Sequence, residues 1–94
     1  MPSEMLTQSI PTSAKECYDA LLEVLPDLGY EIWKTRPIAW LVIARGEIEG
    51  SPLTINAMCS MSTPTTLSLT LSSDGVSSEQ LQKAGNAILE KLKL

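Results

Sequence analysis

The spacing of apolar residues changes twice along this 94-residue chain, and these changes constrain the fold more than any other feature. Between residues 14 and 28, apolar residues recur every three or four positions, which predicts a helix that buries one stripe. From residue 30 to residue 72 the spacing falls to two, which predicts strands with one buried face. The helical spacing returns after residue 80. The pattern therefore predicts a group of consecutive strands that lies between two helices in the chain order.

Prolines, glycines and capping patterns set the expected boundaries. Ser13 with Glu16, and Ser77 with Gln80, have the spacing of a capping box at a helix N-terminus. Short turns are expected at 37–38, 49–52 and 62–64. The expected helices are 13–25, with one further turn to residue 28, and 77 to the C-terminus. The expected strands are 4–10, 30–36, 39–48, 53–61 and 65–72.

The turns between these strands determine the expected sheet type. Parallel neighbours need long crossover connections, whereas the strands from residue 30 onwards are joined by turns of a few residues. Each helix has one apolar stripe, and one face of a single sheet accommodates both. We therefore expect residues 1–94 to form a single α+β domain. It is a two-layer sandwich in the order β-α-β-β-β-β-α, an antiparallel sheet with two helices packed on one face.

Strand parity predicts which side chains face the helices. Leu67, Leu69 and Leu71 alternate with hydroxyl residues, so this leucine set should face inward. The other inward positions expected from alternation are Tyr30 and Ile32; Trp40, Val42, Ala44, Gly46 and Ile48; and Leu53, Ile55, Ala57, Cys59 and Met61.

This assignment leaves a group of apolar side chains on the opposite, open face of the sheet. The predicted interaction patch consists of Trp33, Leu41, Ile43 and Met58. A hydroxyl-rich surround is expected from Thr54, Asn56, Thr66, Ser68 and Thr70. Exposed apolar patches of this kind usually mark association sites. Three explanations stay open: a long loop or the first strand covers the patch, a second copy or a protein partner binds it, or it lines a small-molecule pocket.

Composition excludes several classes of function. The chain has no histidine, and therefore no imidazole for acid–base catalysis near neutral pH or for zinc binding. Seven Lys and Arg against 11 Asp and Glu give a net charge of −4, which disfavours nucleic acid as a partner. Without a signal-peptide pattern or a long apolar run, we expect a cytoplasmic protein that does not bind a membrane.

The residues with reactive side chains form no catalytic signature. Cys17 and Cys59 fall at inward positions without CxxC spacing, so each is expected to behave as a small buried hydrophobe. Glu47 and Glu49 share a strand face in the expected pairing, and two carboxylates at a turn are usually solvated. The sequence therefore predicts no catalytic residue, no metal site and no cofactor.

A second charged group in the sequence is basic. Lys34, Arg36 and Arg45 fall on neighbouring expected strands and could together hold an anion, although solvated or salt-bridged sheet charges are commoner. Taken with the apolar patch, this leads to the expectation of a non-catalytic module for protein interaction or self-association. The alternatives are a small-molecule-binding domain with a pocket between helices and sheet, and a small enzyme or enzyme subunit.

Overall fold

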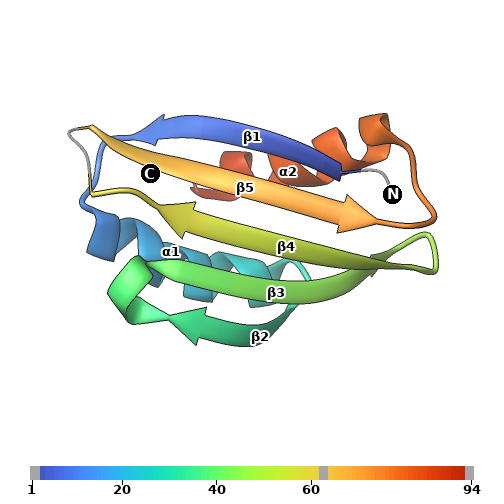
Figure 1. Ribbon diagram of the computed structural model, residues 1–94, viewed down its shortest axis with the longest axis horizontal. Coiled ribbons are helices and arrows are strands. Elements are labelled where there is room, and N and C mark those ends of the chain that lie inside the picture. Colours follow the sequence, from blue (N-terminus) through green and yellow to red (C-terminus); the bar gives the residue numbers. More distant parts are fainter. Residues whose placement is uncertain (1–2, 62–63, 93–94) are drawn as a thin grey trace.

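A computed structural model of the chain contains one antiparallel sheet and two helices (Figure 1). It describes residues 3–61 and 64–92. The elements are β1 (Ser3–Ile10), α1 (Ala14–Asp27), β2 (Glu31–Arg36), the short 3₁₀ helix η1 (Pro37–Ala39), β3 (Leu41–Ile48), β4 (Ser51–Cys59), β5 (Thr65–Ser73) and α2 (Ser78–Leu92). The strand order is β1-β5-β4-β3-β2, and every neighbouring pair is antiparallel.

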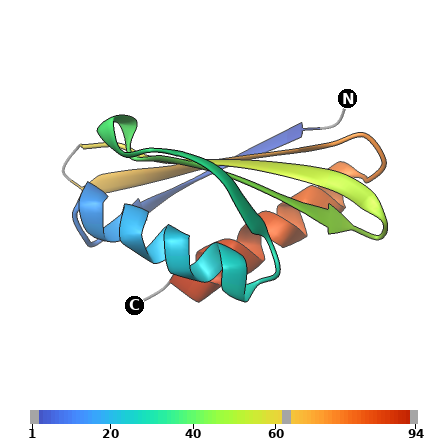
Figure 2. The same cartoon turned by 90° about the horizontal axis from the view of Figure 1, so that it is seen from below.

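Both helices cover the same face of the sheet (Figure 2). α1 packs mainly against β2, β3 and β4, and α2 packs against β1 and β5. A Cβ atom at Gly85 of α2 would lie only 2.8 Å from Leu6 of β1, so glycine permits the close approach of helix and sheet. The expected two-layer α+β sandwich is confirmed. Within the described residues, no helix is both long enough and apolar enough to cross a membrane.

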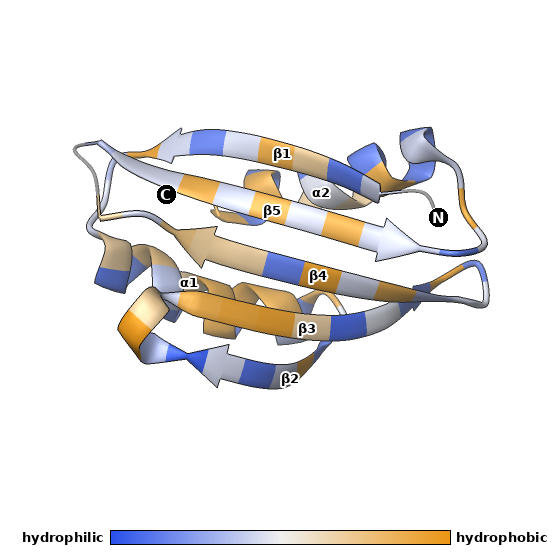
Figure 3. Cartoon of the chain, viewed as in Figure 1, coloured by the Kyte–Doolittle hydropathy of each residue, from blue (hydrophilic) through white to orange (hydrophobic). Residues whose placement is uncertain are grey.

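The core lies between these two layers and follows the predicted parity. Leu67, Leu69 and Leu71 are fully buried, and the stripes of hydropathy along β5 alternate accordingly (Figure 3). The expectation for Met61 is wrong: its side chain is 80% exposed. Its neighbour Ser60 donates its backbone N–H to Thr66, and β4 has already ended at Cys59, so position 61 is no longer in the ladder.

The capping patterns operate as predicted. The Ser13 hydroxyl accepts a hydrogen bond from the Glu16 backbone N–H at 3.2 Å. At α2, the Ser77 N–H donates to the Gln80 side chain and the Gln80 N–H donates to the Ser77 hydroxyl. α1 extends to Asp27, the further turn allowed by the sequence, and Gly29 follows it with a positive φ of 93°.

Two turns differ from the expected boundaries. Glu49 and Gly50, both with positive φ, form a two-residue connection between paired Ile48 and Ser51. This arrangement matches a type I′ hairpin, so Ser51 and the next residue belong to β4 instead of the turn. At the other end of β3, Trp40 is left-handed, with φ 50°, and follows η1, so the strand begins at Leu41 instead of at residue 39 as expected. Residues 62 and 63 of the third expected turn lie outside the described residues.

Candidate functional site: the open face of the sheet

The face of the sheet opposite the helices carries the predicted patch. β1 lies within the sheet as the edge strand beside β5, so one of the three open explanations, that the first strand covers this face, is wrong. In Figure 2 both helices lie on the other side of the sheet, while η1, between β2 and β3, rises at one end of the sheet on the open side. Within the described part of the chain, neither α1 nor α2 therefore covers the patch.

The four predicted patch residues come from three adjacent strands. Leu41 of β3 pairs directly with Met58 of β4, and Ile43 is two residues along the same face of β3. Trp33 is 53% exposed and Met58 is 46% exposed, while Leu41 and Ile43 are partly exposed. The first half of β3 is hydrophobic without alternation (Figure 3), because apolar residues occupy both of its faces. We call Trp33, Leu41, Ile43 and Met58 the open-face patch.

An irregularity in β2 positions Trp33. The register between β2 and β3 shifts between Ile32 and Lys34, so Trp33 is the extra residue of a β-bulge. Before the bulge Ile32 pairs with a buried alanine of β3, and after it Lys34 pairs with Ile43 on the open face. The bulge therefore presents Trp33 and Lys34 on the same side. It also pairs Thr35 with buried Val42, whereas simple alternation along the strand predicts Thr35 on the open face with Trp33, and that prediction is wrong.

Three basic side chains adjoin the open-face patch. The Arg45 guanidinium carbon lies 3.7 Å from the centroid of the Trp33 ring, and the Lys34 Nζ lies 5.9 Å from it. Such contacts hold an exposed tryptophan by cation–π attraction. Lys34 pairs with Ile43, and Arg36 pairs with Leu41, so each apolar patch residue of β3 has a cation opposite it.

The charge of this region differs in sign from that of the whole chain. Residues 31–48 contain three cations and two carboxylates, a net charge of +1, while the remaining residues contain four cations and nine carboxylates, a net charge of −5. In the described ranges, the ion pair within 4 Å is that of Lys15 with Asp19 on α1. The three cations beside the patch therefore have no carboxylate partner at that distance there.

Polar residues occupy the other side of the open-face patch. Asn56 pairs with Ile43 on one side and with Thr70 on the other, and Met58 pairs with Ser68. The polar residues on this side are partly buried within the sheet surface: Thr54, Asn56, Ser68 and Thr70. The arrangement agrees with the hydroxyl-rich surround expected from sequence, and it gives the patch one basic border and one neutral, hydrogen-bonding border.

The two carboxylates considered as a pair do not act together. Glu47 remains on β3, opposite Pro52, whereas Glu49 lies in the hairpin turn. There the Glu49 carboxylate accepts a hydrogen bond from the Gln80 side-chain amide at 2.7 Å. The turn geometry therefore separates the pair that simple strand alternation had placed on one face, and it uses Glu49 to connect the β3–β4 hairpin with the start of α2.

The two cysteines are brought together by the fold. Cys17 of α1 and Cys59 of β4 are both buried, as expected, and their Sγ atoms are 2.8 Å apart. The Cys59 thiol donates to the Cys17 sulfur, which lowers the pKa of Cys17. The same hydrogen bond, together with burial, raises the pKa of Cys59. Sequence reasoning treated each thiol separately, because hydrophobic periodicity does not tell which helix residue lies above which strand residue.

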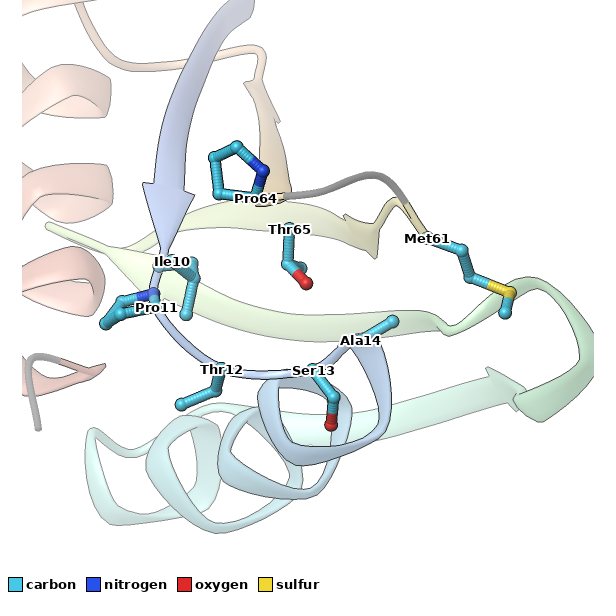
Figure 4. Close-up of a pocket in the computed structure, with 8 residues that line it drawn as sticks. All are labelled: Ile10, Pro11, Thr12, Ser13, Ala14, Met61, Pro64 and Thr65. Atoms are coloured by element: carbon cyan, nitrogen blue, oxygen red, sulfur yellow. The ribbon is translucent and has the colours of Figure 1, made fainter.

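A hollow of about 490 Å³ lies at one end of the sandwich (Figure 4). It is between the β1–α1 connection, the end of β4 and the start of β5, not between the helices and the sheet, where the alternative of a small-molecule-binding domain would place a pocket. Its described lining has hydroxyl groups but no charged side chain. The residues that line it are Ile10, Pro11, Thr12, Ser13, Ala14, Met61, Pro64 and Thr65.

The described residues offer no metal centre, because no three His, Cys, Asp or Glu side chains among them lie close enough to share an ion. The fold and its exposed surface define a small α+β sandwich with an apolar and basic sheet face. No known family model matches the sequence, and no curated protein is similar enough to it to count as a relative. The candidate site is therefore interpreted from its own geometry.

Proposed function

We propose that the protein is a non-catalytic interaction module that binds another protein through the open-face patch. The observation that carries the proposal is the uncovered group of Trp33, Leu41, Ile43 and Met58 on three adjacent strands. Soluble domains rarely leave such groups exposed unless they bind something there. Aromatic, methionine and arginine side chains are also enriched at protein interfaces, and the patch and its basic border contain all three kinds.

The charges beside the patch favour a partner with an apolar centre and an acidic border. Lys34 and Arg36 flank the apolar residues of β3, and Arg45 already stacks on Trp33. Basic groups at the rim of an interface mainly accelerate association with an acidic surface. A second copy of the chain fits less well, because face-to-face packing would bring two sets of basic side chains together. Self-association through the same patch is nevertheless one outcome of the test.

The test compares Ile43→Lys with a matched Gln82→Lys variant. Ile43 lies in the patch, while Gln82 is exposed on α2, so both substitutions change one exposed or partly exposed residue to lysine. A photoactivatable cross-linker at Trp33 of the intact chain, expressed in cells, captures bound protein, and mass spectrometry identifies the attachment site on it. We expect one recurring acidic and apolar segment, captured at least tenfold less by Ile43→Lys and equally by Gln82→Lys, which corresponds to about 1.4 kcal/mol or more of binding free energy.

Two further measurements separate the remaining possibilities. Sedimentation of the purified protein over a wide concentration range detects self-association, which Ile43→Lys should abolish if the patch is a dimer interface. Capture should also weaken as salt is raised, since exposed charges are screened within about 10 Å at 0.1 M ionic strength. Cross-links that are scattered over unrelated proteins, or that are unchanged by Ile43→Lys, would contradict the proposal.

A further inference from the structure

The buried cysteine pair has no part in the proposed binding surface. Cys17 is the fourth residue of α1, at the end of its first turn, and Cys59 is the last residue of β4. Their exposed fractions are 3% and 2%, so neither contributes to the open face. They are 42 positions apart in the chain, and each belongs to a different layer of the sandwich. A bond between them would join the helical layer directly to the sheet.

The distance between the two sulfur atoms is the observation that matters. At 2.8 Å they are within about 0.8 Å of the usual disulfide bond length, a gap that small side-chain rotations can close. We propose that Cys17 and Cys59 form a reversible intramolecular disulfide that fastens α1 to β4 when the protein meets a low-molecular-weight disulfide such as oxidised glutathione. The cysteine pair is then a site of reversible covalent modification inside the core.

The reaction is thiol–disulfide exchange in two steps. The Cys17 thiolate attacks one sulfur of the small disulfide, forms a mixed disulfide and releases one small thiolate, which takes up a proton. Cys59 then loses its proton and attacks the Cys17 sulfur, which breaks the mixed disulfide and releases the second small thiol. Two protein thiols are oxidised, and one small disulfide is reduced to two thiols. An excess of reduced thiol drives the same steps backwards.

Cys17 is the better attacking group for two reasons. Its sulfur accepts the hydrogen bond from Cys59, which favours its thiolate form. It also lies near the N-terminus of α1, where the helix dipole stabilises negative charge. Cys59 is held as the donor of that hydrogen bond and is already placed to resolve the mixed disulfide.

Neither cysteine lines the hollow in Figure 4, but both lie within three residues of side chains that do. Ala14, one of its lining residues, precedes Cys17 by one helical turn, and Met61 follows Cys59 by two residues. The first turn of a helix opens locally at a lower free energy than the whole domain unfolds. Oxidation should therefore proceed in the native protein, but more slowly than at an exposed thiol.

The experiment uses the full chain after reduction, followed by incubation with oxidised glutathione under native conditions. Quenching with acid and alkylation of free thiols precede mass spectrometry. We expect a monomer that has lost two hydrogen atoms, takes up no alkylating group and yields one cross-linked peptide containing Cys17 and Cys59. The oxidised monomer should melt about 10 °C higher than the reduced one, and dithiothreitol should reverse both changes.

Cys17→Ala and Cys59→Ala are the paired controls, and each should show no glutathione-dependent rise in melting temperature. If either variant fails to fold, the wild-type measurement still decides, because it needs no substitution. The proposal is overturned if both thiols remain alkylatable, if the chain stops at a glutathione adduct, if the bridge links two chains, or if the closed disulfide does not raise the melting temperature. Ile43→Lys should close the bridge normally, so this test is independent of the binding surface.

Discussion

The two faces of the sheet are built by the same strands but meet different surroundings. Val42 and Ala44 of β3 have no exposed surface beneath α1, whereas Ile43, between them in sequence, is partly exposed on the open face. All three are apolar, so hydrophobicity alone does not separate core from surface here. β3 therefore has the composition of a strand covered on both sides, although the described part of the chain covers only one side with helices.

The largest expected effect is the difference in unfolding free energy between two lysine substitutions, one on each face of β3. Val42→Lys puts an ammonium group into a fully buried position, so we expect a loss of more than about 4 kcal/mol of unfolding free energy, enough to abolish the fold. Ile43→Lys can extend its amine into solvent and should cost about 1 kcal/mol or less. Circular dichroism and urea denaturation measure both.

Equal destabilisation by the two lysine substitutions would contradict the difference in burial between the two faces of β3. If Ile43→Lys unfolds the chain as Val42→Lys does, the open face is covered in solution. If Val42→Lys is tolerated, the assignment of the inner face is inverted.

An intermediate loss of stability should follow from weakening α1, the helix that covers the inner face of β2, β3 and β4. Ser13→Ala removes the hydroxyl that accepts the Glu16 N–H at the start of α1. We expect a loss of about 1 kcal/mol, or about 4–8 °C in melting temperature. The matched control is Ser9→Ala, because Ser9 is exposed on β1 and makes no cap. A loss from Ser9→Ala as large as that from Ser13→Ala would show that the cap is not the cause.

The smallest expected effect is a pH dependence of the unfolding free energy, caused by Tyr30, the residue before β2. The Tyr30 ring packs against Gly46, where an added Cβ would overlap it, and burial raises the pKa of the Tyr30 hydroxyl. The unfolded chain then loses this proton before the folded one does, so the contribution to stability is complete below about pH 10 and declines as pH rises through the folded pKa. Urea unfolding between about pH 8 and pH 11 should show this decline in the wild type and less of it in Tyr30→Phe.

Much of this contrast between faces could be predicted from sequence. The leucines of β5 define the inner face, and strand alternation then places Leu41, Ile43 and Met58 on the other side. Residue types alone could not predict the bulge at Trp33, because one extra residue in a strand leaves the composition unchanged and shifts only the pairing. Alternation still placed Trp33 correctly, since the shift begins after it and affects Thr35 instead.

The features that sequence reasoning missed depend on contacts between distant elements. The Sγ–Sγ proximity of Cys17 and Cys59 requires a particular height and rotation of α1 above β4. The contact between Glu49 and Gln80 requires the turn conformation at Glu49, which has a positive φ. Local periodicity carries information about which side of an element is buried, but not about which residue of another element it meets.

The position of β1 has a consequence for the order of folding. Ile10 pairs with Thr65 and Ser3 pairs with Ser72, so α1 and three other strands lie in the chain between the two partners. Closing so long a loop costs more conformational entropy than forming the hairpins that join β2, β3 and β4. We therefore expect β1 to be the last strand to join. During synthesis β1 leaves the ribosome before its partner β5, so it stays unpaired until α1 and the three strands between them have been made.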